Sequence, residues 1–396
     1  MQAGNYSLSF DLPIKEWIGK KSTDPHRRPF AVIMKSTDIC NYACHYCYVE
    51  KHCALPRMPI ETAKMTINKV LAYVNPGRKV NFIWHGGEPL LSGKDFFVEV
   101  ADFCDTFHEN PIENCIQTNG SLLDRDFLSF CRARGFLVSV SIDGPASIHD
   151  IHRQTPQGQG TFADTLRALD LVREAGLTPG CVCVLNKANI RHIDELYWFF
   201  STNKINVRIN PVVRSGRAIA AYNELAISAL EYGQAMCRMF DLWFQDNYVI
   251  QIEPLYTILG NFISPVVWGC DYHGRCLESI ISVNPDGSIY PCGRFAGLEE
   301  FRLGNVLEDS DLQNLFSTDL FRRLTHRSVA TVSGCANCAF AEICNAGCMI
   351  TAYMARQSVS DHDYYCEGRR MLFAHIASQL KTHLDSISVA QQATNR

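Results

Sequence analysis

The pattern of hydrophobic and polar positions from residue 30 onward alternates between two kinds of segment. Short runs rich in β-branched and aromatic residues predict six strands. Stretches with apolar residues every three or four positions lie between them and predict helices. The predicted strands are Phe30–Lys35, Val80–His85, Ile112–Thr118, Phe136–Ile142, Gly180–Leu185 and Asn206–Val213. The predicted helices lie near residues 60–75, 94–109, 124–134, 161–176 and 190–202, with a longer one near 221–246.

Strands that alternate with helices pair in parallel through right-handed crossovers. The pattern therefore predicts an α/β fold, a partial (β/α)6 TIM-like barrel, in which functional residues lie on loops at the C-terminal ends of the strands. Residues 1–28 are polar and predict a short N-terminal segment, 29–235 the barrel and 236–268 a connector. Residues 269–396 are rich in cysteine, have few long periodic elements and predict a second, smaller domain.

Charge and composition exclude several classes of partner. The chain has 37 basic and 41 acidic residues and no run rich in Lys and Arg, so we expect no nucleic acid partner. No apolar run approaches the roughly 20 residues that cross a bilayer. Residues 1–21 show no signal-peptide pattern, so we expect a cytoplasmic protein without a membrane partner. Thiols stay reduced in the cytoplasm, and the 18 cysteines therefore indicate metal or redox chemistry rather than disulfides.

Three of these cysteines, Cys40, Cys44 and Cys47, follow the first predicted strand with the spacing C-x3-C-x2-C. Thiolates are the ligands of iron–sulfur clusters, and three of them fill three of the four iron corners of a four-iron cluster. One iron is then open to a substrate or cofactor. The alternative interpretation is that these cysteines are buried and pack as small hydrophobic residues.

Polar or glycine-containing loops follow the next three predicted strands. Gly86 and Gly87 follow the second strand, and we expect them to let the backbone approach a ligand. The third strand ends in the sequence Gln-Thr-Asn-Gly at 117–120 and the fourth in Ser-Ile-Asp-Gly at 141–144. Taken alone, either loop is typical of a helix N-cap or an Asx-turn. Arg153 could hold a carboxylate through two hydrogen bonds or could be a solvated surface charge.

The C-terminal region contains a second set of cysteines. Four thiolates suit tetrahedral zinc, so the spacing C-x2-C-x5-C-x3-C from Cys335 to Cys348 alone is compatible with a zinc knuckle. The full set has eight members: Cys270, Cys276, Cys292, Cys335, Cys338, Cys344, Cys348 and Cys366. Seven other cysteines lie mostly in strand or helix patterns, which predicts core positions. Of these, Cys53 lies closest to the first cysteine loop and is the one to test.

Together, the first cysteine loop, Tyr46 within it and the sequence Gly86-Gly87-Glu88-Pro89 resemble the radical S-adenosylmethionine (SAM) superfamily, over roughly residues 30–215. The resemblance implies that the loop holds a [4Fe–4S] cluster whose open iron binds SAM. It implies that SAM is split by one electron into methionine and a 5′-deoxyadenosyl radical, which takes hydrogen from a C–H bond of the substrate. The implied SAM contacts are Tyr46, Gly86, Gly87, Glu88, Pro89, Gln117, Ser141, Arg153 and Val212.

The C-terminal cysteines resemble the SPASM extension of radical SAM enzymes that modify peptides and proteins. The resemblance implies two auxiliary [4Fe–4S] clusters, three clusters in all, that accept or pass the electron released by a substrate radical. The implied ligands of the first auxiliary cluster are Cys270, Cys276, Cys292 and Cys348. Those of the second are Cys335, Cys338, Cys344 and Cys366.

The resemblance further implies an oxidoreductase that modifies a ribosomally made peptide or protein and takes electrons from a donor such as flavodoxin or ferredoxin. Anaerobic sulfatase maturases of this group have an aspartate after the third cysteine of the first auxiliary cluster, whereas here Gly293 follows Cys292. We therefore expect crosslinking of side chains, of the cyclophane type, with oxidation of Cys or Ser to formylglycine as the alternative. Asp271 and Arg294, which flank cluster cysteines, are the candidates for proton transfer. A small-molecule-modifying relative, an iron–sulfur electron carrier and a zinc scaffold are the remaining alternatives.

Overall fold

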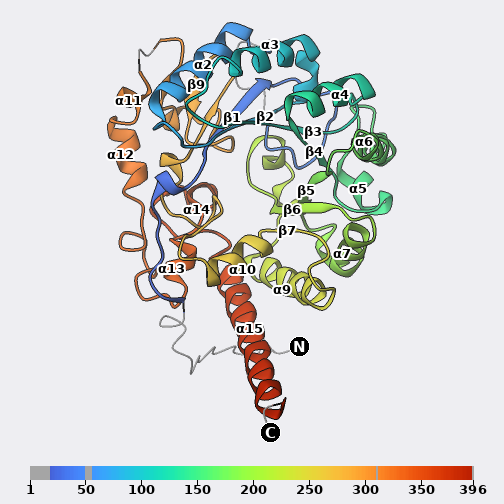
Figure 1. Cartoon of the computed structure of the whole chain (residues 1–396), viewed down its shortest axis with the longest axis vertical. Coiled ribbons are helices and arrows are strands. Elements are labelled where there is room, and N and C mark those ends of the chain that lie inside the picture. The colour runs from blue at the N-terminus through green and yellow to red at the C-terminus, as the bar shows by residue number, and fades with distance from the viewer. Residues whose placement is uncertain (1–17, 50–55, 309–310, 395–396) are drawn as a thin grey trace.

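The structure, a computed structural model, describes residues 18–49, 56–308 and 311–394 (Figure 1), with side chains described up to residue 383. Cys53 lies outside the described residues. All six predicted strands form, and the third and fifth have the predicted bounds. These strands are β1 (Phe30–Thr37), β2 (Val80–Gly86), β3 (Ile112–Thr118), β4 (Leu137–Ser141), β5 (Gly180–Leu185) and β6 (Asn206–Pro211).

The six strands pair in parallel and in chain order, which confirms the predicted α/β fold and partial barrel. The sheet is larger than predicted. At one edge β7 (Ile252–Glu253) pairs with β6, and at the other β8 (Ile280–Val283) pairs in parallel with β1. The strands β9 (Ser288–Tyr290) and β10 (Gly304–Asn305) continue from β8 in antiparallel pairing. The cysteine-rich region therefore extends the barrel sheet rather than forming a separate one.

Helices connect the parallel strands and lie along the outside of the sheet (Figure 1). The barrel helices are α2 (Ile60–Tyr73), α3 (Lys94–Cys104), α4 (Arg125–Arg134), α5 (Ala146–His152), α6 (Phe162–Glu174), α7 (Ile193–Thr202), α8 (Tyr222–Leu225) and α9 (Ala229–Gln245). Local chemistry sets their ends. For example, the Asp124 side chain accepts a hydrogen bond from the Phe127 backbone N–H, and Gly135 ends α4 with a φ of 69°. The helix α5 was not predicted.

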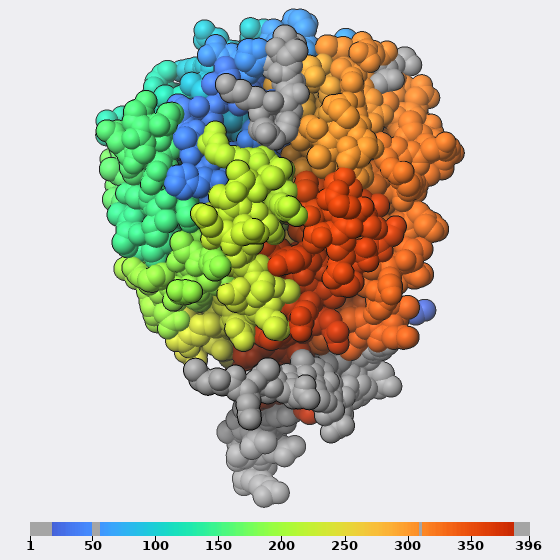
Figure 2. Space-filling model, turned by 180° about the vertical axis from the view of Figure 1, so that it is seen from behind, coloured from blue at the N-terminus to red at the C-terminus, as the bar shows by residue number. Residues whose placement is uncertain are grey.

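The remaining helices lie in the C-terminal part of the chain, and one of them packs closely on the barrel. These helices are α10 (Leu255–Ile263), α11 (Leu312–Leu315), α12 (Asp319–Thr325), α13 (Ala341–Cys344), α14 (Met349–Arg356) and α15 (Cys366–Thr394). A Cβ atom added to Gly368 of α15 would lie 1.9 Å from the Ala229 carbonyl oxygen, so glycine permits the contact between α15 and α9. The resulting contact between the two parts of the chain is visible in Figure 2, where red residues lie against yellow-green ones.

The predicted connector, 236–268, differs from the structure. Its first residues belong to α9, and it also contains β7 and α10, so the barrel layer continues through it. The core beneath the sheet is built from large side chains such as Trp84, Phe82 and Phe97, which are fully buried. Burial of one such side chain stabilises the fold by about 1.5–3 kcal/mol. Among the described helices, none is long and apolar enough to cross a membrane.

Candidate active site

A cavity of about 610 Å³ lies at the C-terminal ends of the barrel strands. The cysteine loop after β1 and the last residues of β2 to β6 contribute to its wall. This is the edge at which parallel barrels carry their chemistry, and the volume is in the usual range for ligand sites. The second domain contributes Arg294 to the same wall. The cavity is therefore enclosed by both parts of the chain.

The three cysteines after β1 all line this cavity. The Tyr42 backbone N–H lies 3.4 Å from the Cys40 sulfur, and the Asn119 amide Nδ2 lies 3.8 Å from it. The Cys47 N–H donates to the Cys44 carbonyl, which makes a tight turn between two of the thiols. Burial raises the pKa of Cys40 to about 12. Since soft thiolates bind iron and N–H donors stabilise their charge, the loop fits a three-thiolate cluster site.

The two glycines at the end of β2, Gly86 within the strand and Gly87 after it, line the cavity and also pack against the cysteine loop. A Cβ atom on Gly87 would lie 2.0 Å from the Ile39 carbonyl oxygen, and one on Gly86 would lie 2.6 Å from that of Thr37. The Gly87 and Glu88 N–H groups donate to these same carbonyls. The side of each glycine that a side chain would occupy is therefore filled by the segment leading to Cys40, not by a ligand. The glycines fix the position of the cysteine loop against β2.

The buried carboxylate of Glu88 connects the ends of β2 and β3. It accepts hydrogen bonds from the Thr118 hydroxyl at 2.7 Å and the Asn119 N–H at 2.8 Å, and also from the Leu90 N–H. Burial raises the pKa of Glu88, and these donors oppose that effect. Asn119 also forms the Asx-turn expected from its sequence, because its side-chain oxygen accepts from the Ser121 N–H. The loops therefore hold one another in place around the cavity.

A buried polar chain crosses the floor of the cavity. Arg153 donates to the Tyr46 hydroxyl at 2.9 Å, and that hydroxyl donates in turn to Asp143. Burial raises the pKa of Asp143, while the charge of Arg153 lowers it. Within the described residues, the buried Nε of Arg153 has no hydrogen-bond partner. Because an unpaired buried donor is costly, this N–H fits an acceptor supplied by a bound ligand.

Most of the predicted SAM contacts come together in this one cavity: Tyr46, Gly86, Gly87, Glu88, Gln117, Ser141, Arg153 and Val212. Pro89 does not line it, and instead begins the short 3-10 helix Pro89–Ser92 that Glu88 caps. Several further lining residues were not predicted, among them Tyr48, Asn210 and Arg217. Two of these three lie beside a predicted feature: Tyr48 follows Cys47 directly, and Asn210 lies near the end of β6. Their place beside these features is the signal by which the sequence could have predicted them.

The cysteines of the second domain fall into two groups. Burial raises the pKa of the Cys276 thiol, and nearby thiolates raise it further. Those thiolates belong to Cys270, Cys292 and Cys348. Burial likewise raises the pKa of Cys344, and the nearby thiolates of Cys366 and Cys338 raise it further. The thiolate of Cys335 in turn raises the pKa of Cys366. The two groups have the membership expected for the two auxiliary clusters, and the ligand assignment stays a prediction. In the part of the chain that the structure describes, no three Cys, His, Asp or Glu side chains converge at the spacing of a single metal ion.

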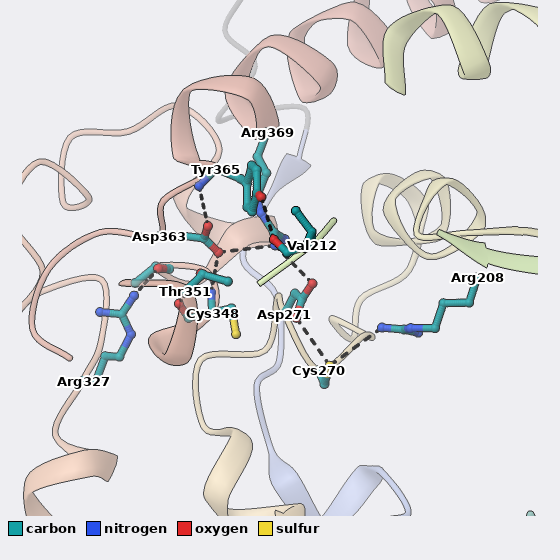
Figure 3. Close-up of polar contacts among 11 residues, drawn as sticks. Arg208, Val212, Cys270, Asp271, Arg327, Cys348, Thr351, Asp363, Tyr365 and Arg369 are labelled. Atoms are coloured by element: carbon teal, nitrogen blue, oxygen red, sulfur yellow. Dashed lines mark hydrogen bonds and ion pairs between the residues drawn. The ribbon is translucent and has the colours of Figure 1, made fainter. Parts of the chain in front are cut away.

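A network of ion pairs and hydrogen bonds surrounds Cys270 and Cys348 of the first group (Figure 3). Arg369, 2% exposed, pairs with Asp271 at 3.1 Å and with Asp363 at 3.3 Å. Asp271 follows Cys270, and the Asp363 carboxylate accepts from the Cys348 N–H at 2.8 Å. The Tyr365 hydroxyl donates to the Val212 carbonyl, which connects the network to the cavity wall.

The two candidates for proton transfer have different surroundings. Burial alone raises the pKa of Asp271, but the cations around it, Arg369 first, outweigh burial and hold the pKa below its usual range. An ionised, paired carboxylate is a weak base. Asp271 also does not line the cavity, whereas Arg294 does. The structure therefore separates Asp271 from the reacting volume.

The chain matches known families in two places. Residues 34–199 match the radical SAM superfamily, and residues 270–339 match the iron–sulfur cluster-binding domain called SPASM. The cysteine-type anaerobic sulfatase-maturating enzyme of Clostridium perfringens (strain 13) is 26% identical over 366 residues, covering 89% of this chain and 97% of that protein. The serine-type enzyme of Bacteroides thetaiotaomicron is also 26% identical, covering 89% of this chain and 91% of that protein.

Solved structures with the same fold include relatives bound to ligands. The structure described as native anSMEcpe with bound AdoMet and Cp18Cys peptide superposes with a TM-score of 0.79 at 25% identity, covering 91% of this chain and 99% of that one. Streptococcus suis SuiB bound to the precursor peptide SuiA superposes with a TM-score of 0.64 at 16% identity, covering 86% of this chain and 76% of SuiB. The second likeness concerns the fold alone.

Proposed function

Because the chain is a radical SAM enzyme with a C-terminal SPASM domain, we propose that it crosslinks side chains within a ribosomally made peptide or protein. SAM and more than one [4Fe–4S] cluster are its cofactors. When bound, they supply a 5′-deoxyadenosyl radical that removes a hydrogen atom from a substrate carbon. The single observation that carries the proposal is the shared cavity, which is lined by the three-thiol loop, by all the predicted SAM contacts except Pro89 and by the SPASM residue Arg294.

The residues of the chain have separable roles in this proposal. Cys40, Cys44 and Cys47 would hold the cluster that binds SAM, and the free Nε of Arg153 would donate to an acceptor of the cofactor. The two groups of SPASM cysteines would hold two further clusters, which gives three per chain. Glu88 and the glycine pair hold the loops against one another and would keep the residues around bound SAM in fixed positions.

The proposal also includes a partner and a location. Each turnover starts with one electron, for which flavodoxin or ferredoxin is the proposed donor. The described thiols are all free, including those that line the cavity. Free thiols at this density are stable in a reducing compartment, so we propose a cytoplasmic location.

Oxidation of a Cys or Ser residue to formylglycine is the second candidate function, because the relatives named above are sulfatase-maturating enzymes. The residue after Cys292 is Gly293 rather than aspartate. A Cβ atom at Gly293 would meet Ile33 and the Tyr48 hydroxyl at 3.4 Å. The chain thus offers no carboxylate at this point of the wall, and this favours the crosslinking reaction.

Co-expression with candidate precursor peptides encoded near the gene tests the proposal. Crosslinking removes two hydrogen atoms from the peptide, leaves no new carbonyl and joins two residues in fragment spectra. Formylglycine formation instead creates an aldehyde that a hydrazide reagent captures. A modified peptide that reacts with hydrazide and contains no crosslink would contradict the crosslinking proposal and support the second candidate.

Substitution of Gly87 by alanine tests the role of the glycine pair. The added methyl group overlaps the Ile39 backbone, so the segment before Cys40 must move. A misplacement of about 1 Å can lower a rate by about 100-fold, and we expect a loss of that order in 5′-deoxyadenosine formation. Gly180→Ala is the matched control, because its nearest neighbour would lie 3.7 Å away. Equal rates in the two variants would show that the close approach is unimportant.

A further inference from the structure

The guanidinium group of Arg294 has no assigned role in the proposed function. Arg294 is half-buried, lines the cavity and lies two residues after Cys292. Among the described residues, no hydrogen bond or close ion pair engages its guanidinium, and the negative charges that act on it, those of Cys348 and Asp271 first, do so without such a contact. A partly buried cation without an acceptor is unfavourable unless a ligand supplies one.

The carboxylates of the cavity wall are already engaged. Glu88 accepts three hydrogen bonds from neighbouring loops, and Asp38 lies 4.0 Å from the Lys35 ammonium group, with which it pairs. Of the other cations, Arg153 donates to Tyr46, and Arg217 donates to the Cys44 carbonyl. Arg153 and Arg217 thus each use at least one donor within the protein, whereas no donor of Arg294 is engaged by a described residue.

The lining side chains beside Arg294, Tyr48 and His85, are uncharged, and the negative groups that act on Arg294, Asp271 among them, belong to residues that do not line the cavity. Gly293 contributes only backbone, and the Tyr48 hydroxyl lies next to it, 3.4 Å from the His85 Nε2. Burial, with the charges of Lys35 and Arg294, lowers the pKa of His85 to about 4, so this imidazole is neutral at pH 7. A substrate at this point of the cavity therefore faces the uncharged side chains of Tyr48 and His85 and one guanidinium fork. Such a fork matches a carboxylate through two parallel hydrogen bonds.

We propose that Arg294 binds an aspartate or glutamate side chain of the substrate, so that the modified peptide carries an acidic residue close to the reacting one. This inference rests on the proposed function, since it takes a peptide to be the substrate. Arg294 is then a specificity-determining residue. A different role, that of a counter-charge, also has a basis in the structure, because Arg294 lies near the thiols of Cys348, Cys270 and Cys292. A substitution of Arg294 changes peptide binding if Arg294 binds the substrate, and it changes the spectra of the auxiliary clusters if Arg294 is a counter-charge.

A selection of random peptides by mRNA display tests the inference without relying on turnover. The fully reconstituted enzyme is immobilised with SAM and without reductant, and the composition of the bound pool is compared with the input. Hydrogen bonds to charged groups correspond to about tenfold in affinity, so we expect about tenfold enrichment of Asp and Glu by the wild type. We expect Arg294→Gln to lose this enrichment and Arg294→Lys to retain part of it. Arg125→Gln removes an exposed arginine of α4 that pairs with Glu174, and it should enrich as the wild type does.

Two results would overturn the inference. The first is a wild-type pool without acidic enrichment, including the recovery of no binders. The second is a peptide pool bound by Arg294→Gln that has the same acidic enrichment as the wild-type pool, together with altered paramagnetic resonance spectra of the auxiliary clusters. That result would show that Arg294 acts only as a counter-charge to the cluster. The proposed function is scored separately, by 5′-deoxyadenosine formation in the wild type without peptide. A failure of the Arg294 inference is therefore distinguishable from a failure of the proposed function.

Discussion

Replacement of Cys40, Cys44 and Cys47 together by alanine is expected to abolish 5′-deoxyadenosine formation and to lower the iron content from about twelve to about eight atoms per chain. The three thiols line the cavity on one loop, and no other cysteine lines it in the part of the chain that the structure describes. Without them the SAM-binding cluster has no ligands, while both SPASM groups remain intact. The measurement is iron analysis and product chromatography after anaerobic reconstitution and reduction with dithionite.

The matched control for this triple variant is Cys131→Ala. Cys131 is fully buried in α4, outside all three predicted ligand groups. Its removal leaves a small cavity, so we expect reduced stability, about twelve iron atoms and normal SAM cleavage. A triple variant that kept about twelve iron atoms, or that still cleaved SAM, would show that the loop is not the site of this chemistry.

The second large effect is expected from Arg369→Ala. This change removes the buried cation that pairs with Asp363, which is buried, and with Asp271, which is partly buried and keeps only the more distant charges of Arg294 and Arg208. Breaking a buried pair in this way typically costs about 3–5 kcal/mol in the free energy of unfolding. We expect a loss of that size in urea unfolding under anaerobic conditions, with loss of iron from the SPASM domain. Arg125→Ala, which removes an exposed pair with Glu174, should cost less than about 1 kcal/mol.

The effect of Arg369→Ala should also depend on pH. Arg369 is the first of the cations that lower the pKa of Asp271 in the folded state. A carboxyl group whose folded pKa is lowered stabilises the protein above its unfolded pKa of about 3.9, and this contribution is lost as the pH falls through the folded pKa. The difference in stability between wild type and variant should therefore be complete at pH 7 and shrink below about pH 4. If the difference in stability between wild type and variant stayed constant down to pH 3, the loss would come from the packing of the Arg369 side chain rather than from its charge.

Local patterns in the sequence were sufficient to predict the barrel strands and most of the cavity wall. Strands such as Gly180–Leu185 are predicted by their own residues, and polar residues at the C-terminal ends of strands, such as Gln117, must lie at the same edge of a parallel sheet. The extension of the sheet could not be predicted in this way. Strand β8 has only four residues, and it pairs with β1 from almost 250 residues away in the chain.

The same limit applies to two features of the site. The sequence Gly86-Gly87 predicts a close approach of the backbone to a ligand, but its contact with the backbone of Ile39 depends on where that segment lies in space. Arg369 lies in a helix next to Arg370, and nothing in that pattern shows which of the two is buried. Its burial depends on Asp271 and Asp363, which reach it from distant parts of the fold.

An anaerobic crystal structure of the reconstituted enzyme with SAM tests the central claim most directly. We predict a four-iron cluster held by Cys40, Cys44 and Cys47, with the amino and carboxylate groups of SAM on the fourth iron. A cluster whose fourth iron is held by a side chain of the protein, or three thiols without metal, would contradict this account.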